Sequence, residues 1–97
     1  YLNEERFTRS YVRGKFYIKK WGRNKIKVNL LQKGISEKLI IKAYDEIDEK
    51  DYLVAIKTIL EKITPTLKGL KEYQKKQKII KYLLSKGYEY DLIVNEI

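Results

Sequence analysis

Basic side chains in the first twenty residues could bind an anion. On a helix with roughly 100° between successive residues, four of them and a tyrosine fall within about 80° of one another: Arg6, Arg9, Arg13, Tyr17 and Lys20. Arginine pairs with phosphate or carboxylate at two points, and an exposed tyrosine can stack on an unpaired base. No acidic residue interrupts these positions, so we predict a binding surface, the basic ridge, rather than an ordinary solvated helix face.

Two further groups of cations are candidates for the same chemistry. Near the C-terminus, spacings of 4, 3 and 4 place one group on a single helix side: Lys71, Lys75, Lys78 and Tyr82. Lysine is a point charge and also keeps helices soluble, so contact and solubility are equal alternatives there. Between the first two helices, we predict that Trp21 anchors the core while Arg23 and Lys25 contact a partner.

Most familiar enzyme chemistry is excluded by composition. The chain has no cysteine and no histidine, so it cannot form a disulfide, a thiolate or imidazole metal site, or a Cys/His or Ser/His catalytic pair. An acidic run from Asp45 to Asp51 lacks the glycine and the ligand spacing of a calcium loop, so capping and solvation explain it. We therefore expect a protein that is not an enzyme and holds no metal or cofactor.

The positive charge is concentrated toward the two ends. The net charge is +9, and residues 1–33 hold ten Lys or Arg but two Glu, whereas residues 34–64 hold five Lys and seven acids. Such an asymmetric surface favours a polyanion or an acidic protein as partner. The longest apolar run, 52–56, is far shorter than the roughly 20 residues of a membrane helix, so we expect no membrane association.

An internal repeat indicates how these residues are positioned. The segments Lys25–Tyr44 and Lys78–Ile97 align without a gap, and both contain Leu-Leu followed by Lys-Gly. Self-similarity at a fixed offset is typical of tandem helical units that bury one another's apolar faces. Function is then expected on a surface rather than in a deep pocket.

The apolar periodicity predicts six helices and no strand. The expected elements are a helix over 4–21 that buries Phe7, Tyr11 and Ile18, a helix over 24–33, a helix after Ser36, a helix from Asp48 to 64, an exposed loop over 65–70, and helices over 71–86 and 90–97. We predict an all-α fold of two tandem three-helix repeats in a right-angled array. The repeats span residues 1–47 and 48–97.

Several motifs in this order resemble the RecX family of bacterial recombination regulators. They are Leu2-Asn3-Glu4-Glu5-Arg6-Phe7, Trp21-Gly22-Arg23-Asn24-Lys25-Ile26, Lys33-Gly34-Ile35 and Tyr82-Leu83-Leu84-Ser85-Lys86-Gly87-Tyr88. The likeness covers essentially the whole chain. It implies the second and third of three helical repeats, so we expect a fragment of a longer protein, in keeping with a start at Tyr1. The family commonly has aspartate and alanine at the positions of Glu4 and Thr8.

The resemblance implies a cytoplasmic, monomeric regulator in DNA repair and the SOS response. Family members bind the RecA filament on single-stranded DNA and mainly inhibit its ATP hydrolysis and strand exchange, and some also bind DNA directly. The basic ridge, the lysines of the 71–82 segment, Arg23 and Lys25 would be the contacts with RecA or DNA. The alternatives are a helical module that binds nucleic acid without RecA, through the same residues, and an inert helical scaffold.

Overall fold

The computed structural model describes residues 3–97, and that part of the chain is helical without a strand. Tyr1 and Leu2, the start of the chain and of its first motif, lie outside the described residues. Six α-helices and two short 3₁₀ helices follow in order: α1 (Glu4–Tyr17), α2 (Arg23–Gln32), α3 (Glu37–Ala43), η1 (Tyr44–Glu46), α4 (Glu49–Ile63), η2 (Thr64–Leu67), α5 (Glu72–Ser85) and α6 (Tyr90–Glu96). The predicted all-α class is confirmed.

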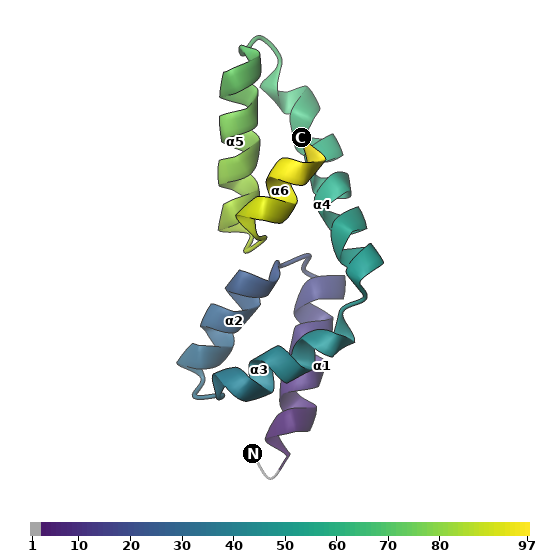
Figure 1. The fold of residues 1–97 in the computed structure, drawn as a ribbon, viewed down its shortest axis with the longest axis vertical. Coiled ribbons are helices and arrows are strands. Elements are labelled where there is room, and N and C mark those ends of the chain that lie inside the picture. The colour runs from purple at the N-terminus through teal and green to yellow at the C-terminus, as the bar shows by residue number, and fades with distance from the viewer. Residues whose placement is uncertain (1–2) are drawn as a thin grey trace.

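Two three-helix units lie end to end along the long axis of the molecule (Figure 1). In the first, α1 packs against α2 and α3, and in the second, α4 packs against α5 and α6. The resulting body is elongated, with extents of 53 × 23 × 19 Å. The predicted tandem arrangement is therefore confirmed. Within the described residues, no helix combines the length and apolar character that a membrane crossing needs.

Side-chain caps and one proline set the helix boundaries. Ser36 Oγ accepts the backbone N–H of Leu39 at 3.3 Å, and the Asp48 carboxylate accepts the N–H groups of Lys50 and Asp51. Helix α4 ends at Ile63, close to Pro65, which has no backbone N–H to continue the α-helical hydrogen bonds. The predicted departure of Thr64 from the helical region is wrong, because Thr64 keeps a φ of −54° and a ψ of −46°. The segment predicted as an exposed loop begins instead with η2, which continues the chain as a tighter helix.

Burial follows the internal repeat in the second and third helices of each unit. Residues 53 positions apart are buried together, in the pairs Ile26/Ile79, Leu30/Leu83, Ile35/Tyr88 and Ile40/Ile93. Gly34 and Gly87 both adopt positive φ values, of 88° and 100°, which glycine reaches without steric cost. Matched burial and matched helix ends confirm that one structural unit occurs twice.

The first helix buries a different face from the predicted one. Thr8, Val12 and Phe16 are buried, whereas Phe7 is 47% exposed and Ile18 is 78% exposed. The prediction assigned the core to the bulkiest apolar residues and passed over Thr8, whose hydroxyl donates to the Glu4 carbonyl at 2.6 Å and is thereby satisfied when buried. Helix α1 also ends at Tyr17, four residues earlier than expected.

Candidate functional site

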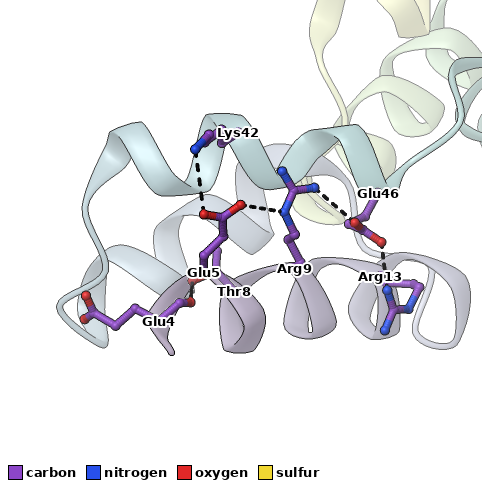
Figure 2. Close-up of polar contacts among 7 residues, drawn as sticks. All are labelled: Glu4, Glu5, Thr8, Arg9, Arg13, Lys42 and Glu46. Atoms are coloured by element: carbon purple, nitrogen blue, oxygen red, sulfur yellow. Dashed lines mark hydrogen bonds and ion pairs between the residues drawn. The ribbon is translucent and has the colours of Figure 1, made fainter. Parts of the chain in front are cut away.

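The basic ridge faces carboxylates from another part of the same repeat. Arg9 Nη1 lies 3.0 Å from Glu46 Oε2, and Arg13 Nη1 lies 2.7 Å from Glu46 Oε1. Arg9 Nε also contacts Glu5 Oε2 at 3.1 Å, so Figure 2 shows a chain of charges between α1 and η1. The premise that this face has no interleaved acids is wrong, because Glu46 approaches it from η1 and Glu5 lies on α1 itself, one turn before Arg9.

The acidic run that follows α3 supplies further partners for the ridge. Tyr17 donates its hydroxyl proton to Asp51 Oδ2 at 2.8 Å and accepts the backbone N–H of Asp48 at 3.3 Å. Lys42 Nζ, from α3, lies 3.7 Å from Glu5 Oε1 (Figure 2). This run therefore does more than cap and solvate, because it ties η1 and the start of α4 to α1.

These contacts shift the ionisation of the ridge residues. Hydrogen bonds from Arg9 and then Arg13 lower the pKa of Glu46, and a hydrogen bond from Arg9 lowers the pKa of Glu5. The same bonds to Glu5 and Glu46 raise the pKa of Arg9. Both carboxylates are thus held in their charged form, which is the form that neutralises the ridge.

We predict that Glu46→Gln lowers the thermal unfolding midpoint at neutral pH. A carboxylate whose pKa falls on folding adds stability above its ordinary pKa, and that stability is lost as the pH drops through the lowered value. The difference in midpoint between the two proteins should therefore shrink as the pH is lowered to about 3. Calorimetry across that range checks this, and a difference that does not change with pH would contradict the charge-based explanation.

The other predicted contact residues do not form one continuous surface. Arg6 is exposed beside Arg9 and Arg13, and Lys20 is exposed with a positive φ of 60°. Lys25 Nζ lies 4.5 Å from the centre of the half-buried Trp21 ring, which packs against the core as expected. On the second repeat, Lys71 and Lys78 are exposed and Lys75 is half-buried. Contact between these residues and a partner stays a prediction.

Arg23 lies at the junction between the two repeats and contacts residues of the second one. Its guanidinium carbon lies 4.0 Å from the centre of the Tyr52 ring. Its Nε lies 2.8 Å from Glu89 Oε2; this contact is an ion pair but not a hydrogen bond, because the N–H bond does not point at the oxygen. Its backbone N–H donates to the Tyr52 hydroxyl at 3.0 Å, and that hydroxyl donates to Glu89. Only 19% of the Arg23 side chain is exposed, so its predicted role toward a partner would compete with these bonds.

Backbone contacts between two glycine corners complete the junction. The Gly22 N–H donates to the Lys86 carbonyl at 2.7 Å, and the Asn24 N–H donates to the Gly87 carbonyl at 2.9 Å. The Tyr88 hydroxyl donates to the Lys20 carbonyl, also at 2.7 Å, and so fixes the backbone at its left-handed position. These bonds join the repeats without a broad helix–helix contact.

A hollow lined by lysines lies beside the junction and was missed by the sequence analysis. Two adjoining hollows, of about 310 and 410 Å³, share Lys20, Ile59 and Lys62. Phe16, Val54 and Ala55 extend the apolar lining of the first, and Lys19, Lys86 and Tyr82 surround the second; we call the whole the junction groove. Its cations lie at or just beyond the ends of α1, α4 and α5, so helical periodicity within one segment indicated only Lys20, as part of the ridge.

Within residues 3–97, no three metal-ligating side chains lie close enough together to hold a metal ion. A further hollow on the second repeat is formed by Leu70 and, on α5, by Gln74, Gln77, Lys78 and Lys81. The features that could act on a partner are therefore charged surfaces: the partly neutralised ridge, the α5 lysines and the junction groove.

Comparison with known proteins places both repeats in one family. Residues 3–43 match the family model described as RecX, second three-helix domain, and residues 49–95 match RecX, third three-helix domain. The chain is 36% identical to the regulatory protein RecX of Clostridium perfringens (strain SM101) over 92 residues, which is 93% of this chain and 42% of that protein. It is 33% identical to the regulatory protein RecX of Streptococcus uberis, covering 96% of this chain and 35% of that protein.

A solved structure has the same fold. The crystal structure of RecX from Lactobacillus salivarius superposes with a TM-score of 0.90 at 30% identity, over 97% of this chain and 61% of that one. The chain thus spans less than half the length of the curated relatives cited here. Two consecutive family domains and a shared three-dimensional structure lead to one conclusion: this chain belongs to the RecX family of regulatory proteins.

Proposed function

We propose that this chain binds the RecA filament on single-stranded DNA and lowers its ATP hydrolysis and strand exchange, without being an enzyme itself. The observation that carries the proposal is the membership of both repeats in the RecX family of regulatory proteins. The proposal places the chain in the cytoplasm, acting as a monomer during DNA repair and the SOS response.

The shape and the charge of the chain support this role. A body 53 Å long and about 20 Å across can contact a filament over a longer distance than a sphere of equal mass. Its net charge of +9 favours encounter with a polyanionic assembly. Among the predicted contacts, four exposed cations form no ion pair within residues 3–97: Arg6, Lys20, Lys71 and Lys78. Because Arg9 and Arg13 are bound to Glu46, these four are the better contacts.

We predict that the chain binds RecA-coated DNA more tightly than bare DNA. The measurement is fluorescence anisotropy on labelled single-stranded DNA, bare and coated with RecA and a non-hydrolysable nucleotide, at physiological salt. ATP hydrolysis by the filament should fall over the same concentration range. The double variant Arg6→Glu/Lys78→Glu should weaken binding about tenfold, because it reverses two exposed charges, whereas Lys38→Glu on α3 is the control.

Three outcomes would contradict the proposal. Equal or tighter binding to bare DNA, with a steep loss of affinity on adding salt, would favour the nucleic-acid module instead. Binding to neither form would leave the chain as a helical scaffold. Tight binding to the coated strand without any fall in ATP hydrolysis would separate filament binding from inhibition.

A further inference from the structure

We propose that the junction groove binds an acidic peptide segment that carries an aliphatic anchor residue. The groove includes Tyr17 and Lys20 from the end of the ridge but none of the α5 lysines Lys71, Lys75 and Lys78, and the proposal does not depend on which protein bears the segment. It starts from the distribution of charge: the groove is lined by Lys19, Lys20, Lys62 and Lys86, and none of the four forms an ion pair within residues 3–97.

Six of the 22 Lys and Arg residues form ion pairs within residues 3–97, and none of these six lines the groove. Arg9 and Arg13 are paired with Glu46, Arg23 with Glu89, and Lys27 with Glu37. Asp51 is the carboxylate that lines the groove, and its Oδ2 is already occupied by the Tyr17 hydroxyl. The groove therefore holds a concentration of positive charge that the rest of the chain does not neutralise, and a negatively charged partner would do so.

The floor of the groove distinguishes a peptide from a nucleic acid strand. Val54, Ala55 and Ile59 form an aliphatic surface beside the ring of Phe16, and Val54 is 58% exposed. An apolar centre with a polar, charged rim is the anatomy of a protein–protein contact. Strand binding relies instead on several aromatic platforms and on two-point phosphate contacts by arginine. The groove offers Tyr82 as its exposed aromatic ring, and its cations are all lysines.

The junction also holds the groove in a defined shape. Lys20 adopts a left-handed backbone conformation, which is uncommon for a residue other than glycine and persists only where neighbours enforce it. The neighbour is Tyr88 of the second repeat, whose buried ring packs 5.2 Å from Tyr52 and whose hydroxyl donates to the Lys20 carbonyl. Lys19 and Lys20, which follow α1, are thus held in place relative to α4 and α5. This reduces the entropy that is lost when a partner binds and orders the site.

The test uses fluorescein-labelled synthetic peptides and this chain alone, without RecA. One probe is a short glutamate-rich peptide with two leucines one helical turn apart; a second has serine in place of both leucines, and a third is single-stranded oligo(dT). We expect the first probe to bind most tightly. Lys62→Glu/Lys86→Glu should weaken it about tenfold, and Lys38→Glu/Lys68→Glu, exposed lysines outside the groove, should not.

Val54→Ser tests the apolar floor without disturbing the fold, because that side chain is largely exposed. It should weaken the leucine-containing peptide severalfold and leave the serine peptide unchanged. The proposal is overturned if the two peptides bind equally, or if Lys62→Glu/Lys86→Glu binds like its control. Preferential binding of oligo(dT), lost in the same variant, would assign the groove to nucleic acid. None of these results depends on the RecA experiment, so the two proposals fail separately.

Discussion

Gly22→Ala should destabilise the chain by about 3 kcal/mol, because it places a methyl group where two backbones meet. A Cβ at Gly22 would overlap the carbonyl carbon and oxygen of Gly87 and the amide nitrogen of Tyr88. Backbone atoms cannot rotate away as a side chain does. The corners must therefore separate, with loss of the hydrogen bond from Gly22 N–H to the Lys86 carbonyl.

The conformation of Gly22 is not the reason for this sensitivity. Its φ of −77° and ψ of 168° suit any residue, so the cost comes from close approach alone. Gly14→Ala is the matched control, because a Cβ there would meet nothing within 4 Å and alanine is favoured over glycine inside a helix by about 0.5–1 kcal/mol. We expect that variant to be slightly more stable than the natural sequence.

Chemical denaturation measures the loss of stability in Gly22→Ala, and small-angle X-ray scattering measures the separation of the two corners. Gly22→Ala should unfold at a lower denaturant concentration and, in its folded form, should populate a wider range of inter-repeat orientations. If it retains both the midpoint and the scattering profile of the parent chain, the two corners do not approach as closely in solution as in this structure.

The sequence predicted those parts of the fold that depend on local chemistry. The helices expected after Ser36 and from Asp48 begin where these short polar side chains accept N–H groups of the first helical turn. The equivalence of Leu30 and Leu83 followed from an ungapped repeat, which transfers burial from one copy to the other. Such predictions depend only on residues a few positions apart in the sequence, or on a repeated segment whose burial can be transferred from one copy to the other.

The face of α1 could not be assigned in the same way. Two apolar stripes with helical spacing pass through this segment, one through Phe7 and Tyr11 and the other through Val12 and Phe16. The second is buried because it packs against α2 and α3, whose positions are set by loops and not by α1. Thr8 is also buried on this face, and because threonine is polar, a search for apolar residues does not include it in the stripe.

The candidate site was predicted least well, because its charges are balanced over long sequence distances. Arg9 lies far from Glu46 in the chain, and the acidic run was judged separately from the ridge that it neutralises. In both three-helix units the third helix packs back on the first, so an acidic run just after the third helix is a signal that it faces the first helix. By that signal, Arg9 and Arg13 are expected to pair with carboxylates of their own repeat rather than with a partner.

Glu89→Ala should also destabilise the chain, by about 2–3 kcal/mol, since it leaves the Arg23 guanidinium with little compensation in a largely buried place. Burial of Arg23 disfavours its charged form, but the charges of Glu89 and other neighbours raise the pKa of Arg23 overall. Removal of Glu89 leaves Glu49, at 3.5 Å, on the exposed side, and it also removes the acceptor of the Tyr52 hydroxyl.

A second ion pair shows that burial, not distance, decides the size of this effect. Lys27 Nζ lies 2.5 Å from Glu37 Oε2, closer than the 2.8 Å between Arg23 and Glu89, but the Glu37 side chain is 58% exposed and that of Glu89 is 27% exposed. Water screens the closer pair and solvates either partner once the other is removed, so Glu37→Ala should change the unfolding midpoint little. Equal losses of stability in the two variants would mean that the junction is hydrated, and that Arg23 is available to a partner after all.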